Sequence, residues 1–111
     1  MDTYILFRGG LFSMRFHVKV YRVQSEVLVA VCDEAVYGRS YAEGELVLKA
    51  DKKFFGRSTV GEEELQGMLM EATIANLIGE DAVAFGVKLG LIDPENVITV
   101  QGVPHAQMVR M

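Results

Sequence analysis

Hydrophobic and polar residues alternate from Arg15 to Val23, and this alternation predicts a β-strand. One face of the strand then carries Phe16, Val18 and Val20. The other face carries Arg15, His17, Lys19 and Tyr21. An unbroken apolar run that is rich in valine follows at 27–32, and it indicates a second strand in the interior of a sheet.

Gln24 and Ser25 separate these two strands and suggest a hairpin. If they form the whole loop, Val23 lies opposite Glu26 and the antiparallel register follows along both strands. His17 then lies opposite Cys32 on the second face. Although Gln-Ser is a poor sequence for a two-residue turn, this register places the apolar residues of both strands on one dry face.

The next segment predicts a short helical turn and a third strand. Asp33 is a suitable cap for a turn over 34–37, which Gly38 would end in the left-handed conformation. The apolar residues of 45–50 indicate a strand. We expect 51–59 to be a loop.

A long helix is expected to begin near Gly61, with three glutamates at the positive end of its dipole. We predict that it continues through 65–78, where the residues after the first turn are nearly all apolar. A helix with so little polar surface is normally buried on most sides. In its apolar half, Thr73 and Asn76 would lie on the same side because they are three residues apart.

The C-terminal third predicts a second helix over 81–89, a turn started by Asp93-Pro94, and two strands over 97–101 and 104–109. The predicted fold is therefore α+β, with a mixed, mainly antiparallel sheet packed against two consecutive helices. Its expected order is ββ(short α)βααββ. Residues 3–7 could form one more short strand, but we treat 1–13 as an N-terminal extension and 14–111 as a single domain.

Composition limits what this chain can be. With 111 residues it fits one domain, and half of its residues are hydrophobic, but no apolar stretch approaches the ~20 residues needed to cross a bilayer. The surplus apolar surface would go into a core, into a homodimer interface, or into both. A single cysteine and the lack of a basic leader before Tyr4 predict a cytoplasmic protein without a secretory signal.

Several motifs in the second half of the chain resemble a known family. The segments ATIANLIGE, GLIDPENV and GVPHAQ, together with KVYRV and FFGRS, are similar to the archaeal proteins grouped as domain of unknown function family 424. The resemblance runs from about residue 14 to the end of the chain. It implies an archaeal cytosolic protein without an established activity.

The segment Gly102–Gln107 contains the first candidate for chemistry. Pro104 fixes the backbone beside His105, whose ordinary pKa lies near neutrality, so His105 could act as a general base. The alternative is that His105 only makes a structural hydrogen bond. Asn76 could reach this turn, and the candidate binding residues are Thr73, Asn76, Pro104, His105 and Gln107.

His17 and Cys32 are the second candidate because the hairpin register makes them cross-strand neighbours. An imidazolium beside a thiol lowers its pKa and makes it nucleophilic. In the alternative interpretation, Cys32 is a small buried hydrophobic residue at the end of an apolar run.

The third candidate is a basic and aromatic cluster. Cationic side chains occur on the polar face of the first strand and around Phe54 and Phe55, and they are Arg15, Lys19, Lys49, Lys52, Lys53 and Arg57. Such a cluster could hold phosphates and stack bases. The alternative is a set of solvated lysines beside two phenylalanines of the core, which the net charge of −4 favours.

These candidates support three hypotheses for function. The first is a non-enzymatic protein that docks on RNA, on a ribonucleoprotein or on a protein partner. The second is a small enzyme that uses His105 as its general base, with Asn76 nearby. The third is a structural homodimer. We predict no metal and no cofactor, because the acidic residues lack metal-ligand spacing with a histidine and the glycines form no phosphate-binding loop.

Overall fold

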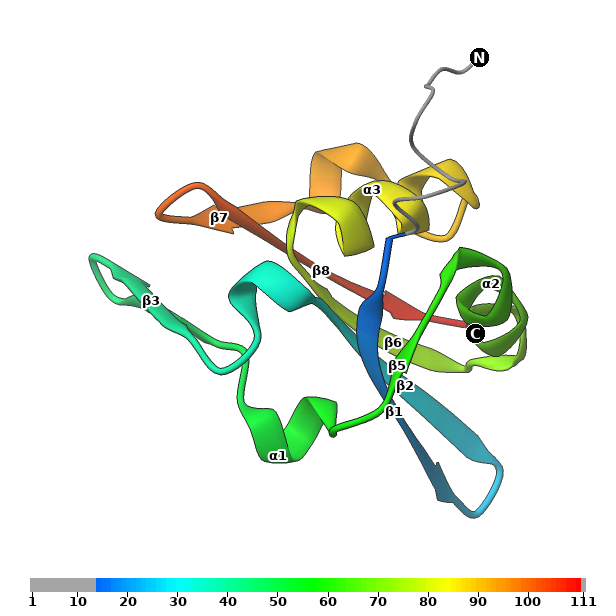
Figure 1. The fold of residues 1–111 in the computed structure, drawn as a ribbon. Coiled ribbons are helices and arrows are strands. Elements are labelled where there is room, and N and C mark those ends of the chain that lie inside the picture. The colour runs from blue at the N-terminus through cyan, green and yellow to red at the C-terminus, as the bar shows by residue number, and fades with distance from the viewer. Residues whose placement is uncertain (1–13, 111) are drawn as a thin grey trace, which may run out of the picture.

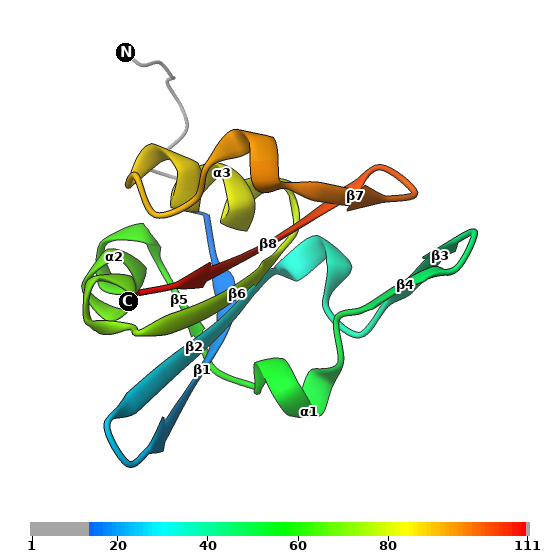
Figure 2. The same cartoon turned by 180° about the vertical axis from the view of Figure 1, so that it is seen from behind.

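A six-stranded sheet lies at the centre of residues 14–110, which are the residues that the computed structural model describes (Figures 1 and 2). Its strand order is β5-β1-β2-β6-β8-β7. The strands are β1 (Phe16–Val23), β2 (Glu26–Asp33), β5 (Thr59–Val60), β6 (Ile74–Ile78), β7 (Ile98–Val100) and β8 (Val103–Val109). The pair β2–β6 is parallel and the other pairs are antiparallel, so the predicted α+β class with a mixed, mainly antiparallel sheet is confirmed.

Helices and a small second sheet complete the described chain. The helices are α1 (Lys52–Phe55), α2 (Glu62–Glu71) and α3 (Glu80–Lys88), and the 3-10 turns are η1 (Glu34–Val36) and η2 (Pro94–Asn96). The second sheet is a hairpin of β3 (Ser40–Glu43) and β4 (Leu46–Lys49). Among the described residues, no helix is long and apolar enough to cross a membrane. The strand predicted over 3–7 and the extension predicted over 1–13 lie outside these residues.

The predicted register of the first hairpin is confirmed. Val23 pairs with Glu26, and His17 pairs with Cys32. Gln24 adopts the left-handed conformation that this tight turn needs, with φ of 56°. The faces also follow the alternation, because Phe16 and Val18 are buried while His17 and Lys19 lie on the other side.

The long helix predicted over 65–78 is wrong. Helix α2 begins after Gly61 as expected but ends at Glu71, and Ile74–Ile78 forms β6 between β2 and β8. Thr73 fixes this junction to β2, because its Oγ1 accepts a hydrogen bond of 2.8 Å from the backbone N–H of Val27. A short apolar run fits a buried helix and a central strand equally well, and here pairing with two neighbouring strands decides for the strand.

Three predictions for the middle of the chain need correction. The strand predicted over 45–50 is β4, and its partner β3 was not predicted. The loop predicted over 51–59 contains α1 and the first residue of β5. The two helices are therefore separated by β6 and are not consecutive. The C-terminal elements agree with the sequence: α3, the cap of η2 by Asp93, and the strands β7 and β8 lie where they were predicted.

Asp33 caps a different helix from the one predicted. Its side chain makes no capping bond to η1; its two carboxylate oxygens accept hydrogen bonds from the backbone N–H groups of Asp81 (2.9 Å) and Ala82 (2.8 Å), at the start of α3. A Cβ on Gly79 would collide with this carboxylate. Burial raises the pKa of Asp33, and the two backbone hydrogen bonds partly oppose this rise.

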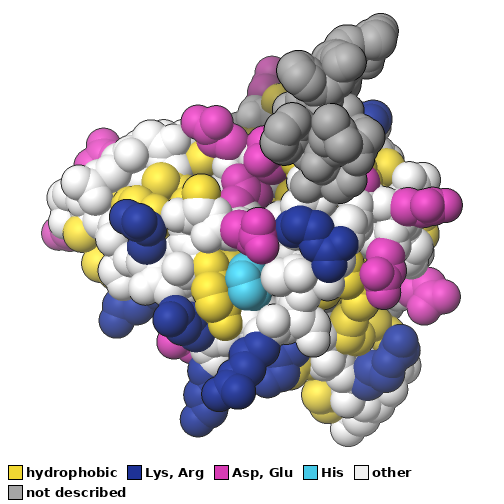
Figure 3. All heavy atoms as spheres, in the orientation of Figure 1, with side chains coloured by type: hydrophobic (Ala, Val, Ile, Leu, Met, Phe, Trp, Pro, Cys, Tyr) yellow, Lys and Arg dark blue, Asp and Glu magenta, His cyan; other side chains and the backbone are white. Residues whose placement is uncertain are grey.

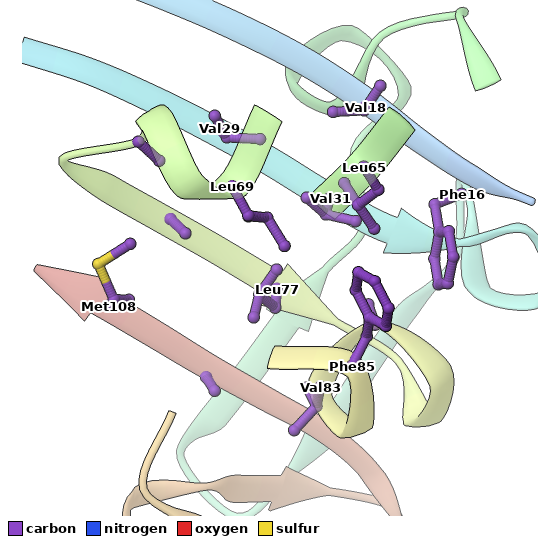
Figure 4. Packing of buried hydrophobic residues seen from close by; sticks show 14 of the residues in the cluster. Phe16, Val18, Val29, Val31, Leu65, Leu69, Leu77, Val83, Phe85 and Met108 are labelled. Atoms are coloured by element: carbon purple, nitrogen blue, oxygen red, sulfur yellow. The ribbon is translucent and has the colours of Figure 1, made fainter. Parts of the chain in front are cut away.

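The sheet has a hydrophobic core on each face. Helices α2 and α3 cover the first face, where Leu65, Leu69 and Phe85 pack against residues such as Val31 and Leu77 (Figure 4). On the second face η1, β4 and α1 cover Ala30, Cys32, Ile78 and Val100 with Val36, Leu48 and Phe55. The many apolar residues of the chain are therefore buried in two cores, one on each face of the sheet.

Candidate binding surface around helix α1

Helix α1 is short and presents two lysines to solvent. Asp51 caps it, because its Oδ2 accepts a hydrogen bond of 3.1 Å from the backbone N–H of Phe54. Gly56 ends it with φ of 79°. Phe55 is buried in the second core, and this anchoring leaves Lys52 and Lys53 exposed.

A hollow of about 650 Å³ lies between α1 and the edge of β1, and we call it the basic hollow. Its lining residues are Val18, Lys19, Tyr37, Lys52, Lys53, Gly56, Arg57 and Ser58. Four of these carry a positive charge, although they come from two segments far apart in the sequence. On the face drawn in Figure 3, Lys and Arg side chains gather in the lower half, and Asp and Glu lie mainly above and to the right. The volume is within the range of ligand sites, about 300 to 1,000 Å³.

Aromatic rings support the basic side chains. The rings of His17 and Tyr37 stack with centroids 3.5 Å apart, and Lys52 Nζ lies 5.7 Å from the centroid of Tyr37. Lys19 Nζ lies 5.1 Å from the ring of Tyr21, which in turn stacks on Phe54. Cation-π contacts of this length favour a side chain that lies across a ring. The lysines are therefore partly oriented before any ligand binds.

The other two residues of the predicted basic cluster lie elsewhere. Arg15 donates hydrogen bonds to the backbone oxygen (2.9 Å) and Oγ1 (3.1 Å) of Thr59, so it holds β5 beside the start of β1. Lys49 is at the end of β4 and lines a second hollow. The structure thus brings together Lys19, Lys52, Lys53 and Arg57, and separates Arg15 and Lys49 from them.

The second hollow has a volume of about 240 Å³ and lies between α1, β4 and the second face of the sheet; we call it the polar hollow. Its buried floor consists of Leu48, Phe55 and Ile78. The half-buried residues are Phe54, Asn76 and His105, and the exposed residues are Lys49 and Asp51. It is therefore apolar at its base and carries polar groups higher up.

Asn76 and His105 form a hydrogen-bonded pair in the polar hollow. They lie on the adjacent strands β6 and β8, and His105 Nε2 is 3.1 Å from Asn76 Oδ1. An amide oxygen only accepts, so Nε2–H donates and Nδ1 remains an acceptor. Burial lowers the pKa of His105, which favours the neutral ring. The predicted contact between Asn76 and the His105 turn is confirmed, although Asn76 reaches it from a strand.

The remaining candidate binding residues lie at different places along β6 and β8. Gln107 pairs with Asn76 across the strands, and the backbone oxygen of Pro104 accepts a hydrogen bond of 2.9 Å from Gly79 N–H. Thr73 lies at the other end of β6, where its hydroxyl donates to Glu26 Oε1 at 2.7 Å. The structure does not bring Thr73 to the polar hollow.

Cys32 is unsuited to nucleophilic chemistry. It lies opposite His17 as predicted, but it is fully buried, and burial together with the Asp33 carboxylate raises the pKa of its thiol to about 12. His17 Nδ1 lies 3.3 Å from the backbone oxygen of Gly56, to which it donates. Within residues 14–110, no three His, Cys, Asp or Glu side chains are placed to hold a metal ion.

No pattern in the sequence pointed to Tyr37, whose ring stacks on His17 and lines the basic hollow. Tyr37 follows η1, far along the chain from β1, and only the fold places its ring on His17. Gly56 and Ser58 of the lining also carry no chemical signature in a sequence. A search for charged and titratable residues alone cannot find such positions.

Comparison with known proteins identifies the family of this chain. A family model described as "Protein of unknown function (DUF424)" matches residues 21–111. The chain belongs to the DUF424 family. The fold of this DUF424 protein is similar to the crystal structure of an uncharacterized conserved protein from Methanopyrus kandleri, an archaeon, with a TM-score of 0.69.

That neighbour is 21% identical in sequence, and the match covers 87% of this chain and 95% of the other. A likeness at this identity shows the fold alone. No curated protein matches this DUF424 protein. Its function must therefore be argued from the surface around α1.

Proposed function

We propose that this DUF424 protein is a cytoplasmic, non-enzymatic protein that binds single-stranded RNA, free or within a ribonucleoprotein. The observation that carries the proposal is the convergence of Lys19, Lys52, Lys53 and Arg57 around one hollow, in a chain whose net charge is −4. Basic grooves with neighbouring aromatic side chains are the usual way of binding a single strand without sequence preference.

Charge separation across the molecule supports this proposal. Acidic residues occupy the first turns of α2 and α3, which cover the first face of the sheet, whereas the basic hollow lies beside α1. A polyanion therefore meets the positive side in one orientation and is repelled from the other. The overall negative charge does not oppose binding at a local patch of this kind.

The salt dependence of binding tests the proposal. A labelled single-stranded RNA oligonucleotide is titrated with protein, and its fluorescence anisotropy is followed at increasing salt concentration. If four cations each neutralise one phosphate, log affinity falls against log salt with a slope of about −3, because each contact contributes about −0.7. Binding that does not depend on salt, or no binding at low salt, would contradict the proposal.

Matched variants locate the contact. We expect Lys53→Ala and Arg57→Ala each to reduce the magnitude of the slope by about 0.7 and to weaken binding. Lys88→Ala is the control, since Lys88 lies on α3, which covers the opposite face of the sheet. Equal effects of all three substitutions would show that binding follows overall charge, without a site at the basic hollow.

A small enzyme with His105 as general base is the second candidate function. The observation that favours it is the Asn76 hydrogen bond, which leaves His105 Nδ1 free to accept a proton. Among the described residues, no serine, threonine or cysteine lines the polar hollow to act as a nucleophile, so binding is the better supported function. Mass spectrometry of oligonucleotides after incubation tests this candidate: products formed by the wild type and absent with His105→Gln would favour it.

A further inference from the structure

We infer that the polar hollow holds one unstacked nucleobase of the bound RNA strand, an inference that rests on the proposed function. The two hollows lie on either side of α1. Lys52 and Lys53 line the basic hollow, and Asp51, Phe54 and Phe55 line the polar hollow. Because α1 has four residues, it is only about 6 Å long, so a strand with phosphates in the basic hollow has bases within reach of the polar one.

The chemistry of the polar hollow suits a base and not a phosphate. Its floor consists of buried apolar side chains, and its exposed rim carries one positive charge on Lys49 and one negative charge on Asp51. A phosphate would lose its hydration against this floor, and the Asp51 carboxylate offsets the attraction of Lys49. A nucleobase has apolar faces for the floor and for the ring of Phe54, and its polar edge carries hydrogen-bond donors and acceptors.

The Asn76–His105 pair can read such an edge. Because Asn76 Oδ1 is bonded to His105, the Asn76 side-chain NH₂ is available to donate, and neutral His105 Nδ1 is available to accept. The pair therefore offers one donor and one acceptor, from adjacent strands, for hydrogen bonds with the polar groups of a base. The hollow has room for about eight water molecules at about 30 Å³ each, and so for one base.

An abasic oligonucleotide separates base binding from phosphate binding. We would compare the affinity of the protein for a single-stranded RNA oligonucleotide and for an abasic sugar-phosphate strand of equal length, at one low salt concentration. The wild type is expected to bind the base-bearing strand at least about fivefold more tightly, which is the lower end of the effect of one stacked base. Lys53→Ala should weaken binding to both strands by the same factor.

Substitutions in the polar hollow should weaken binding of the base-bearing strand and leave binding of the abasic strand unchanged. We expect Asn76→Ala and His105→Gln each to lower the preference for bases, because hydrogen bonds to the base edge are lost while stacking on Phe54 remains. Lys88→Ala is again the control, because Lys88 lies on α3, which covers the opposite face of the sheet. It should keep the preference.

A second measurement does not depend on whether the variants fold. In NMR spectra of the wild type, the Asn76 side-chain amide and the His105 ring should shift with the base-bearing strand and not with the abasic one. Equal affinity of the wild type for both strands, with no such shifts, overturns the inference and leaves RNA binding intact. Failure to bind either strand overturns the proposed function, and the inference with it.

Discussion

His105 shows how much of a side chain's chemistry depends on its surroundings. The sequence places a histidine after a proline, but partial burial lowers its pKa and the bond to Asn76 selects one tautomer. Burial favours the neutral ring, and the hydrogen bond to Asn76 leaves Nδ1 as the free acceptor nitrogen of that ring. Cys32 shows the same dependence, because burial raises the pKa of its thiol to about 12 and keeps it protonated.

The lowered pKa of His105 predicts a pH-dependent stability. The folded protein binds this proton less tightly than the unfolded chain, so the contribution of His105 is complete above the ordinary pKa of 6.5 and is lost as pH falls through the folded-state pKa. Urea unfolding at several pH values should therefore show a steeper loss of stability below pH 6.5 for the wild type than for His105→Gln. Other titrating groups are common to both proteins and cancel in the difference. Parallel curves for the two proteins would show that the folded-state pKa of His105 is not lowered.

At the scale of elements, Asp33 connects the end of β2 to the start of α3. Its carboxylate satisfies two backbone N–H groups that a helix leaves without partners inside itself. Gly79, with φ of 114°, allows the chain to turn there without a side chain in the space that the carboxylate occupies. The contact determines where α3 begins above the first face of the sheet.

Removing the contact between Asp33 and the start of α3 should destabilise the protein. We expect Asp33→Ala to lower the free energy of unfolding by at least about 2 kcal/mol, because a helix cap is lost and buried donors are left without partners. Asp93→Ala is the control: Asp93 caps η2 through a single hydrogen bond of 2.9 Å to Glu95 N–H at an exposed position. Its loss should cost about 1 kcal/mol or less, as measured by chemical denaturation. Similar losses of free energy of unfolding in the two variants would mean that the burial of the Asp33 cap adds nothing to stability.

At the scale of the whole molecule, covering both faces of the sheet changes the expectation of a homodimer. The composition suggested surplus apolar surface, but two cores use most of it. Within residues 14–110, the large hydrophobic side chains that remain exposed are spread over five elements, β1, β4, α2, β7 and β8. They are Val23, Leu46, Val47, Met70, Ile98 and Val109. Stable homodimer interfaces usually contain a contiguous apolar centre.

We therefore expect a monomer in solution. Light scattering coupled to size-exclusion chromatography should give a mass close to 12.3 kDa at micromolar concentration. The measurement is best repeated over a tenfold range of concentration, because a weak dimer would appear only at the upper end. A stable dimer at the lowest concentration would restore the homodimer hypothesis.

The sequence by itself determined the local features of this protein. The alternation of residues in β1 set which side chains face each core, and the two-residue loop Gln24-Ser25 set the register that pairs His17 with Cys32. Helix α3 and the hairpin of β7 and β8 followed from their caps, glycines and apolar runs. These signals are local because each depends on the backbone preferences and periodicity of a few neighbouring residues.

Only the tertiary structure decided the rest. Apart from Asn76, residues 74–78 are apolar on both sides, so their own pattern fits either a buried helix or a strand, and pairing with β2 and β8 made them a strand. The basic hollow likewise depends on contacts over a long distance in sequence, because Lys19 meets Lys52 and Lys53 only when α1 packs beside β1. Composition and net charge average over the chain, whereas a binding surface depends on which distant residues the fold places together.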